Sequence, residues 1–199
     1  MNNSYGCIAY YDDVLNYNLK NIKLEKHINK IVNEMPTPNI NFKKEVNKVQ
    51  KVMSRYSRNN QIKISKRYDE IVSFFYQICK KKINKTEVEY YRNVVNKLVL
   101  KLKIKFNVQR PFQGSYKVNK CIHPIALPTT HTPSLPSGHT SLFYFLYIYF
   151  SKIDPENKSK YKRLYERGAM SRIIGGNHFF IDNEYSIIAM DRLVSFMEL

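Results

Sequence analysis

The sequence predicts an all-α protein, a single-domain helical bundle with its active site between helices. Apolar residues recur at steps of three and four along most of the 199 residues, whereas the period-two alternation of strands is scarce. Helix start and stop signals separate these apolar stripes. With 43% hydrophobic residues, the chain can bury a substantial core. No internal repeat or linker divides it.

We divide the chain into an N-terminal helical extension, residues 1–34, and a helical domain, residues 35–199. In the extension, a loose apolar stripe predicts a helix over Lys20–Met35. Pro36 and Pro38 end it, because proline cannot continue a helix.

Three further helices are expected before the middle of the chain. Apolar residues at helical spacing predict helices at about Phe42–Tyr56 and Lys66–Lys80. The next helix is the clearest, because Thr86–Glu89 reads as a capping box followed by a long apolar stripe. Arg110–Pro111 ends this helix, since the residue before proline is disfavoured in helical geometry.

The second half begins with a proline-rich segment, Pro111–Pro136, that is expected to be an irregular functional loop. Helix returns at Ser137–Ser151. Asp154–Glu156 then supplies an N-cap, a first-turn proline and an early acid for a helix that runs to about Arg172. A last helix carries the apolar residues between Ile181 and Phe196.

The composition favours anionic partners. Lys and Arg number 33 against 16 Asp and Glu, a net charge of +17. Such a surface attracts phosphorylated small molecules, nucleic acid or an acidic membrane face. The three cysteines, Cys7, Cys79 and Cys121, form no CxxC pair, so neither a disulfide framework nor a zinc site is expected.

The sequence predicts a soluble protein without a transmembrane segment. Its strongest apolar run, Leu142–Phe150, reads as a buried core helix, because a membrane span needs about 20 residues. The N-terminal residues lack the basic start and apolar run of a secretory signal. We therefore expect a cytoplasmic or otherwise intracellular location.

Three short segments collect the residues that suit phosphate chemistry. They read Lys103-x6-Arg110-Pro111, Pro136-Ser137-Gly138-His139 and Ser171-Arg172-x5-His178-x3-Asp182. Arginine and lysine side chains bind phosphate oxygens, so Lys103, Arg110 and Arg172 are candidate phosphate ligands. Ser137 and Gly138, at a helix N-terminus, would add backbone N–H donors.

The same segments supply a nucleophile and an acid. His178 and Asp182 are four residues apart, so on a helix they share one face. The carboxylate would fix the imidazole tautomer and leave the other ring nitrogen free to attack phosphorus. His139 would then protonate the leaving oxygen. A bend at Gly175–Gly176 is expected to bring Arg172 and His178 to one phosphate.

Each of these residues alone has an ordinary explanation, as a surface charge, a helix cap or a turn. Together and in this order, the three segments resemble the signature of a superfamily. It unites type 2 phosphatidic acid phosphatases, bacterial class A acid phosphatases and vanadium-dependent haloperoxidases. Similarity to the class A branch extends to Met35–Pro38, Arg110–Phe112, Pro136–Ser141 and Tyr165–Gly176, and the resemblance covers residues 35–199.

The resemblance implies a metal-independent phosphatase that hydrolyses phosphomonoesters through a phosphohistidine intermediate. It needs no cofactor, and vanadate is expected to inhibit it as a phosphate mimic. The implied partners are a phosphorylated small molecule and a second copy of the chain; the basic surface adds peripheral contact with acidic surfaces. The implied site consists of His178 as nucleophile, Asp182 as its partner, His139 as acid, and Lys103, Arg110, Ser137, Gly138 and Arg172 as phosphate ligands.

Two alternatives stay open at this point. A vanadate-dependent haloperoxidase would use the same anion-binding residues, although the chain is short for that class. A basic nucleic-acid-binding protein on an inactive phosphatase fold would use the net charge of +17 and the 16 tyrosines. Against it, the basic residues are dispersed and no nucleic-acid-binding motif is found.

Overall fold

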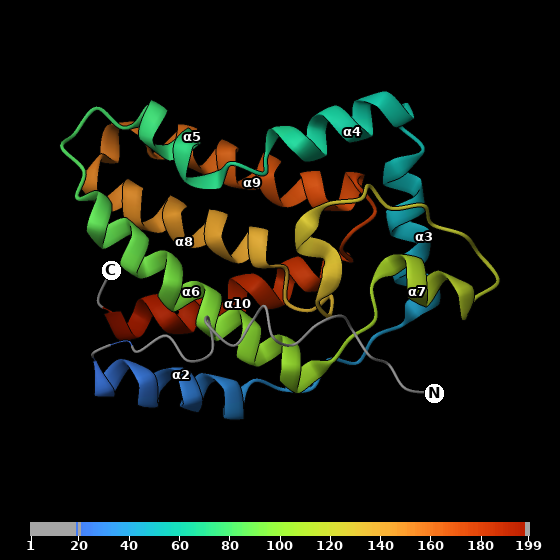
Figure 1. Cartoon of the computed structure of the whole chain (residues 1–199), viewed down its shortest axis with the longest axis horizontal. Coiled ribbons are helices and arrows are strands. Elements are labelled where there is room, and N and C mark those ends of the chain that lie inside the picture. The colour runs from blue at the N-terminus through green and yellow to red at the C-terminus, as the bar shows by residue number, and fades with distance from the viewer. Residues whose placement is uncertain (1–18, 20, 198–199) are drawn as a thin grey trace.

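Helices make up most of the computed structural model, which describes residue 19 and residues 21–197 (Figure 1). No strand occurs in this part of the chain, so the predicted all-α class is confirmed. In chain order the elements are α2 (Ile22–Glu34), α3 (Phe42–Met53), α4 (Arg58–Arg67), α5 (Ile71–Ile78), α6 (Lys85–Phe106), α7 (Pro111–Tyr116), the 3-10 turn η1 (Pro128–His131), α8 (Gly138–Ile153), the 3-10 turn η2 (Pro155–Asn157), α9 (Lys158–Ile174) and α10 (Phe180–Met197).

Helix α8 forms the centre of the bundle. It contacts α5, α6, α9 and α10, and Figure 1 shows it in the middle, with α5 and α9 above it and α10 and α2 below. The predicted core run Leu142–Phe150 lies on this helix, where Phe143, Phe145 and Phe150 are fully buried. None of the described helices is both long and apolar enough to cross a membrane.

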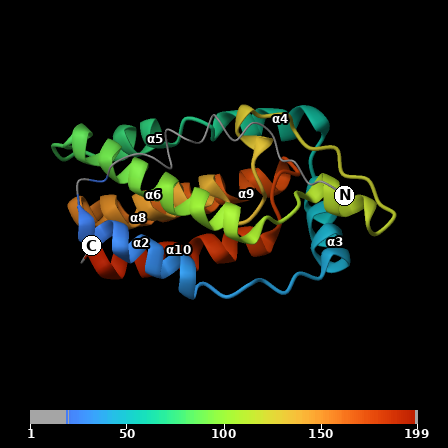
Figure 2. The same cartoon turned by 60° about the horizontal axis from the view of Figure 1, so that its bottom comes forward.

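Helix α2 contributes to the same core. Leu24, Ile28 and Ile31 are buried in the cluster that also holds residues of α6, α8 and α10. Glu25 pairs with Lys97 at 2.7 Å and with Lys101 at 3.0 Å, both on α6. Figure 2 shows α2 in front of α10. The first part of the predicted extension, residues 1–18, lies outside the described residues.

The prediction of a single helix over Lys66–Lys80 is wrong, because this segment contains the end of one helix, α4, and the whole of another, α5. The first, α4, is capped by Ser57, whose hydroxyl accepts a hydrogen bond from the Asn60 amide at 3.3 Å. It ends at Arg67, and α5 starts at Ile71. The residues between them, 68–70, leave the helical path, and the Asp69 carboxylate bonds to side chains of α8 and α9. A tertiary contact has overridden the local pattern.

The segment Pro111–Pro136 is more regular than predicted. Helix α7 occupies its start, and η1 lies near its end. Arg110 is the extended residue before α7, and its backbone N–H donates to the Gln113 side chain at 2.9 Å. The proline at position 111 fits the first turn, where no helical N–H bond is lost.

Two predicted helix starts are also corrected. The residue that caps α6 is Asn84 rather than Thr86, and its side chain accepts from the Glu87 amide at 3.3 Å. After Asp154 the chain first forms η2, and α9 begins only at Lys158. In both cases the predicted helix is present, and only the residue at which it begins differs from the prediction. Local sequence signals locate the ends of helices less well than their middles.

The close approach of α8 and α9 depends on Gly168. A Cβ atom at this position would overlap the ring of Phe143, which is fully buried against Phe75 and Tyr68. We expect Gly168→Ala to lower the free energy of unfolding by about 1–3 kcal/mol, the usual cost of overpacking a filled core. Chemical denaturation measures this change.

The matched control is the double variant Gly168→Ala/Phe143→Leu. The smaller side chain makes room for the added methyl group, so the two substitutions should cost less together than the sum of each alone. Additive losses would show that the overlap with Phe143 is not the cause.

Candidate active site

Six of the eight predicted site residues line one cavity of about 600 Å³, and the other two, Ser137 and Asp182, lie outside its lining. This volume lies within the range of about 300–1,000 Å³ that is usual for small-molecule sites. The lining also includes two carboxylates that were not predicted as site residues, Asp69 and Glu70. The predicted residues in the lining are Lys103, Arg110, Gly138, His139, Arg172 and His178.

Lys103 lies in the last turn of α6 and holds the segment that precedes α8. Its ammonium group donates to the carbonyl oxygens of Pro133 and Ser134, the latter at 3.1 Å. Burial, and then the charge of Arg110, lower the pKa of Lys103 well below its usual value. An anion that enters the cavity would therefore stabilise the charged ammonium.

Arg110 is held on several sides. Its Nε donates to the Thr132 carbonyl at 2.8 Å, and Nη1 donates to the Asn177 carbonyl at 2.9 Å. Nη1 also lies 3.3 Å from Nε2 of His178. The guanidinium is buried and fixed beside the imidazole before any ligand binds.

The hydrogen bonds of His178 define its tautomer. Nδ1 lies 2.9 Å from Oδ2 of Asp182, and a carboxylate can only accept, so Nδ1 carries the proton. A guanidinium can only donate, so Nε2 carries a lone pair that faces Arg110. Burial, followed by the charges of Arg110 and Lys103, lowers the pKa of His178 well below its usual value. His178 is therefore a neutral imidazole with Nε2 unprotonated.

Asp182 lies behind His178, in the first turn of α10. Its Oδ2 also accepts from the Phe179 amide at 2.9 Å and from the Ser134 hydroxyl. Burial raises the pKa of Asp182 to about 6, although both of these donors act in the opposite direction. At neutral pH the group is a carboxylate. The predicted pairing of His178 with Asp182 is present, but His178 itself precedes the helix, which starts at Phe180.

The sequence analysis missed Asp69, which joins two predicted site residues. Its Oδ1 lies 2.6 Å from Nη2 of Arg172 and 3.0 Å from Nε2 of His139. The hydrogen bond from His139, and then the charge of Arg172, lower the pKa of Asp69 to about 2. The available signal was an acidic pair, Asp69 and Glu70, just after the basic end of α4, and local patterns alone do not connect this pair to residue 172.

His139 is a neutral imidazole in this structure at neutral pH. Burial is the largest cause that lowers its pKa to about 4, and the hydrogen bond to Asp69 opposes it. The unfolded chain takes up a proton at this residue before the native chain does. The lowered pKa of His139 therefore reduces the free energy of unfolding as the pH falls from 6.5, the ordinary pKa of histidine, towards about 4.

The glycine pair has the predicted effect on the chain. Gly175 ends α9, and Gly176 has φ +70°, in the left-handed region that favours glycine. The chain turns there, and the Asn177 amide donates to the Arg172 carbonyl at 3.0 Å. Arg172 and His178 consequently line the same cavity.

Ser137 and Gly138 differ in what they offer the cavity. The Ser137 hydroxyl is fully buried and caps α8, accepting from the Thr140 amide at 3.3 Å; Ser137 is not part of the cavity lining. Gly138 does line the cavity. A Cβ there would make only an ordinary contact of 3.6 Å with Val99, so packing within the chain does not demand glycine.

Comparison with protein-family models and with curated proteins gives no match to this chain. In the part of the chain that the structure describes, no three His, Cys, Asp or Glu side chains are grouped as metal ligands would be.

The ion pair around Asp69 allows a direct test of how His139 is tuned. We expect Asp69→Asn to lower the pKa of His139 below its value of about 4, because the lost carboxylate favours the imidazolium and Arg172 is left unopposed. NMR titration of the His139 ring measures the shift. Asp191→Asn is the control, since Asp191 bonds to Tyr144 instead and should leave His139 unchanged. An unchanged or raised pKa in Asp69→Asn would contradict this account.

Proposed function

We propose that this protein is a phosphatase that transfers the phosphoryl group of a phosphomonoester to Nε2 of His178 and then to water. The observation that carries the proposal is the fixed tautomer of His178. Its unprotonated Nε2 belongs to a cavity that Lys103, Arg110 and Arg172 also line. A neutral imidazole is a nucleophile, and three cations are what a phosphate dianion requires.

Binding of the phosphate frees the nucleophile. Arg110 Nη1 lies 3.3 Å from Nε2 of His178 and shields its lone pair. Phosphate oxygens are stronger acceptors for a guanidinium than a neutral imidazole is, so they would replace Nε2 as the partner of this N–H group with little movement of Arg110. Gly138 leaves room for close approach at the N-terminus of α8, where the helix dipole favours an anion.

In the first step Nε2 of His178 forms a bond to phosphorus, and the ester P–O bond breaks. The leaving oxygen takes a proton from His139. His139 is protonated at that stage because the bound phosphate dianion raises its pKa. The negative charge nearby opposes the effect of burial, which lowers the pKa of His139 in its absence. His178 becomes positively charged, and the Asp182 carboxylate at 2.9 Å stabilises that charge.

In the second step, water attacks the phosphorus atom while His139, now neutral, takes one of its protons. The P–N bond breaks and His178 returns to its neutral form. When phosphate leaves, His139 releases the proton that it took from water to solvent, and both imidazoles are neutral again. The same two histidines thus serve both steps, and the protons balance over the cycle.

The resemblance of the three segments to the phosphatidic acid phosphatase, acid phosphatase and haloperoxidase superfamily supports the same assignment. In that reading Lys103, Arg110, Gly138 and Arg172 bind the phosphate. Ser137 acts as the cap that fixes the start of α8.

The nucleophile can be tested with p-nitrophenyl phosphate between about pH 4 and 8 in the presence of EDTA. We expect activity that vanadate inhibits and that His178→Asn lowers by about a thousandfold or more, as removal of a nucleophile does in other hydrolases. A phosphate label on the protein that is stable to alkali and labile to acid would identify the phosphohistidine.

His123→Asn is the matched control, because His123 is exposed and does not line the cavity. It should retain full activity. A wild-type protein that is inactive across this pH range, or a His178→Asn variant that keeps its activity, would contradict the proposal.

The acid role of His139 predicts a dependence on the leaving group. We expect His139→Gln to lower the hydrolysis of an alkyl phosphate such as glycerol 2-phosphate by about 10²–10⁴-fold, the usual size of general acid catalysis. The loss for p-nitrophenyl phosphate should be much smaller, because its leaving group needs little protonation. Steady-state rates with both substrates give the comparison, and equal losses would assign His139 to binding instead.

A further inference from the structure

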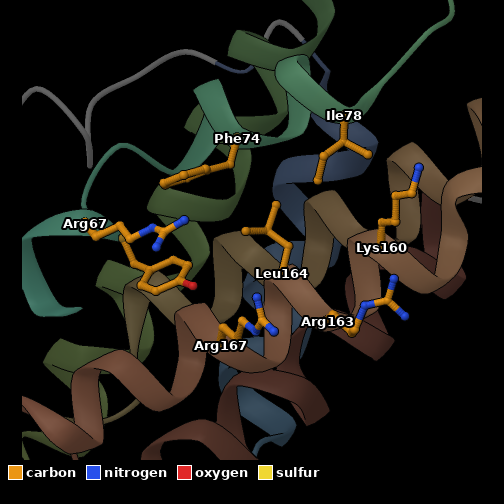
Figure 3. A pocket seen from close by; sticks show the side chains of 8 residues that line it. Arg67, Phe74, Ile78, Lys160, Arg163, Leu164 and Arg167 are labelled. Atoms are coloured by element: carbon orange, nitrogen blue, oxygen red, sulfur yellow. The ribbon is translucent and has the colours of Figure 1, made fainter.

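A second cavity is lined by residues of α4, α5 and α9 and of the connection between α4 and α5. It has a volume of about 260 Å³, and its lining brings together cationic and apolar side chains. Figure 3 shows Arg67 at one side, Phe74 and Ile78 on α5, and further side chains on α9. The complete lining is Arg67, Tyr68, Phe74, Ile78, Lys160, Arg163, Leu164 and Arg167.

Four cations converge on this cavity and no carboxylate lines it. Lys160, Arg163 and Arg167 are three and four residues apart on α9, so they share one face of the helix. Arg67 approaches from the end of α4. None of the ion pairs found among the described residues includes any of these four. Like charges at this spacing repel one another, and a bound anion would relieve the repulsion.

The floor of the cavity is apolar. Tyr68 and Leu164 are each 8% exposed, and the rings of Tyr68 and Phe74 lie 5.6 Å apart. Arg67 lies over the Tyr68 ring at 5.8 Å. The four cationic residues are exposed, and they surround a hollow whose base includes aromatic side chains. An inorganic anion would satisfy the cations but leave the half-buried Phe74 in contact with water.

We infer that this cavity is a second binding site, for an organic anion that joins phosphate or sulfonate-type charge to an apolar or aromatic body. The cations would bind the charged groups, and the floor formed by Tyr68, Phe74 and Leu164 would bury the apolar part. This assignment does not depend on the phosphatase activity, because no residue of the second cavity takes part in the proposed reaction.

The second site adjoins the candidate active site through the chain itself. Arg67 and Tyr68 line the second cavity, and the next residue, Asp69, lines the first. Asp69 holds both Arg172 and His139.

The test uses naphthalene-1,5-disulfonate, a probe that carries the required charge and apolar body and that a phosphatase cannot hydrolyse. Isothermal titration calorimetry on the full chain should give one site. We expect Arg163→Gln/Arg167→Gln to weaken binding by about tenfold or more, which corresponds to about 1.4 kcal/mol.

Two controls define the site. Lys158→Gln/Lys162→Gln removes the same charge from the same helix at exposed residues outside the lining, and it should bind the probe as the wild type does. Arg110→Gln removes a cation from the first cavity only, and it should also leave binding unchanged. Equal loss in the two α9 double variants would mean non-specific attraction. Loss in Arg110→Gln would place the probe in the first cavity. Either result, or no binding by the wild type, overturns the inference.

A second arm distinguishes a soluble ligand from a lipid headgroup. The wild type and both α9 double variants are sedimented with phosphatidylcholine vesicles that contain phosphatidylglycerol. Binding that is lost only in Arg163→Gln/Arg167→Gln and that the disulfonate displaces would assign the site to a lipid headgroup. Absence of such binding, with the calorimetric result as expected, would assign it to a soluble organic anion.

Discussion

One buried carboxylate oxygen, Oδ2 of Asp182, connects the parts of the candidate active site. It accepts from Nδ1 of His178, from the Phe179 amide and from the Ser134 hydroxyl. Lys103 binds the carbonyl oxygen of that same Ser134 from α6. The loop before α8, the start of α10 and the end of α6 are thereby fixed relative to one another. This arrangement sets the orientation of the His178 imidazole.

The cavity concentrates positive charge at a cost in stability. Lys103, Arg110 and Arg172 are each no more than 5% exposed, and burial lowers the pKa of both Lys103 and Arg172. Backbone carbonyls and the Asp69 carboxylate compensate for part of the lost hydration. Groups held in this way need little rearrangement when an anion arrives, which is the physical basis of electrostatic preorganisation.

Most elements of the fold could be predicted from the sequence, because amphipathic stripes and proline positions are local signals. The apolar run of α8 and the break at Gly175–Gly176 are examples. The errors occur where a tertiary contact competes with local propensity. Residues 68–70 leave the helix when the Asp69 carboxylate binds Arg172, a residue about a hundred positions away. Short elements such as α7 also give too few residues for a periodic signal.

The sequence by itself determined the helical class and the set of cations, imidazoles and the carboxylate of Asp182 that suit phosphate chemistry. Residue types and their spacing within short segments are enough for these two predictions. Tertiary structure alone decided that Arg110 faces Nε2 of His178 and that Asp69 joins His139 to Arg172. It also decided that Arg67 meets the basic face of α9. These contacts join segments distant in the chain, and the packing of the helices brings them within reach.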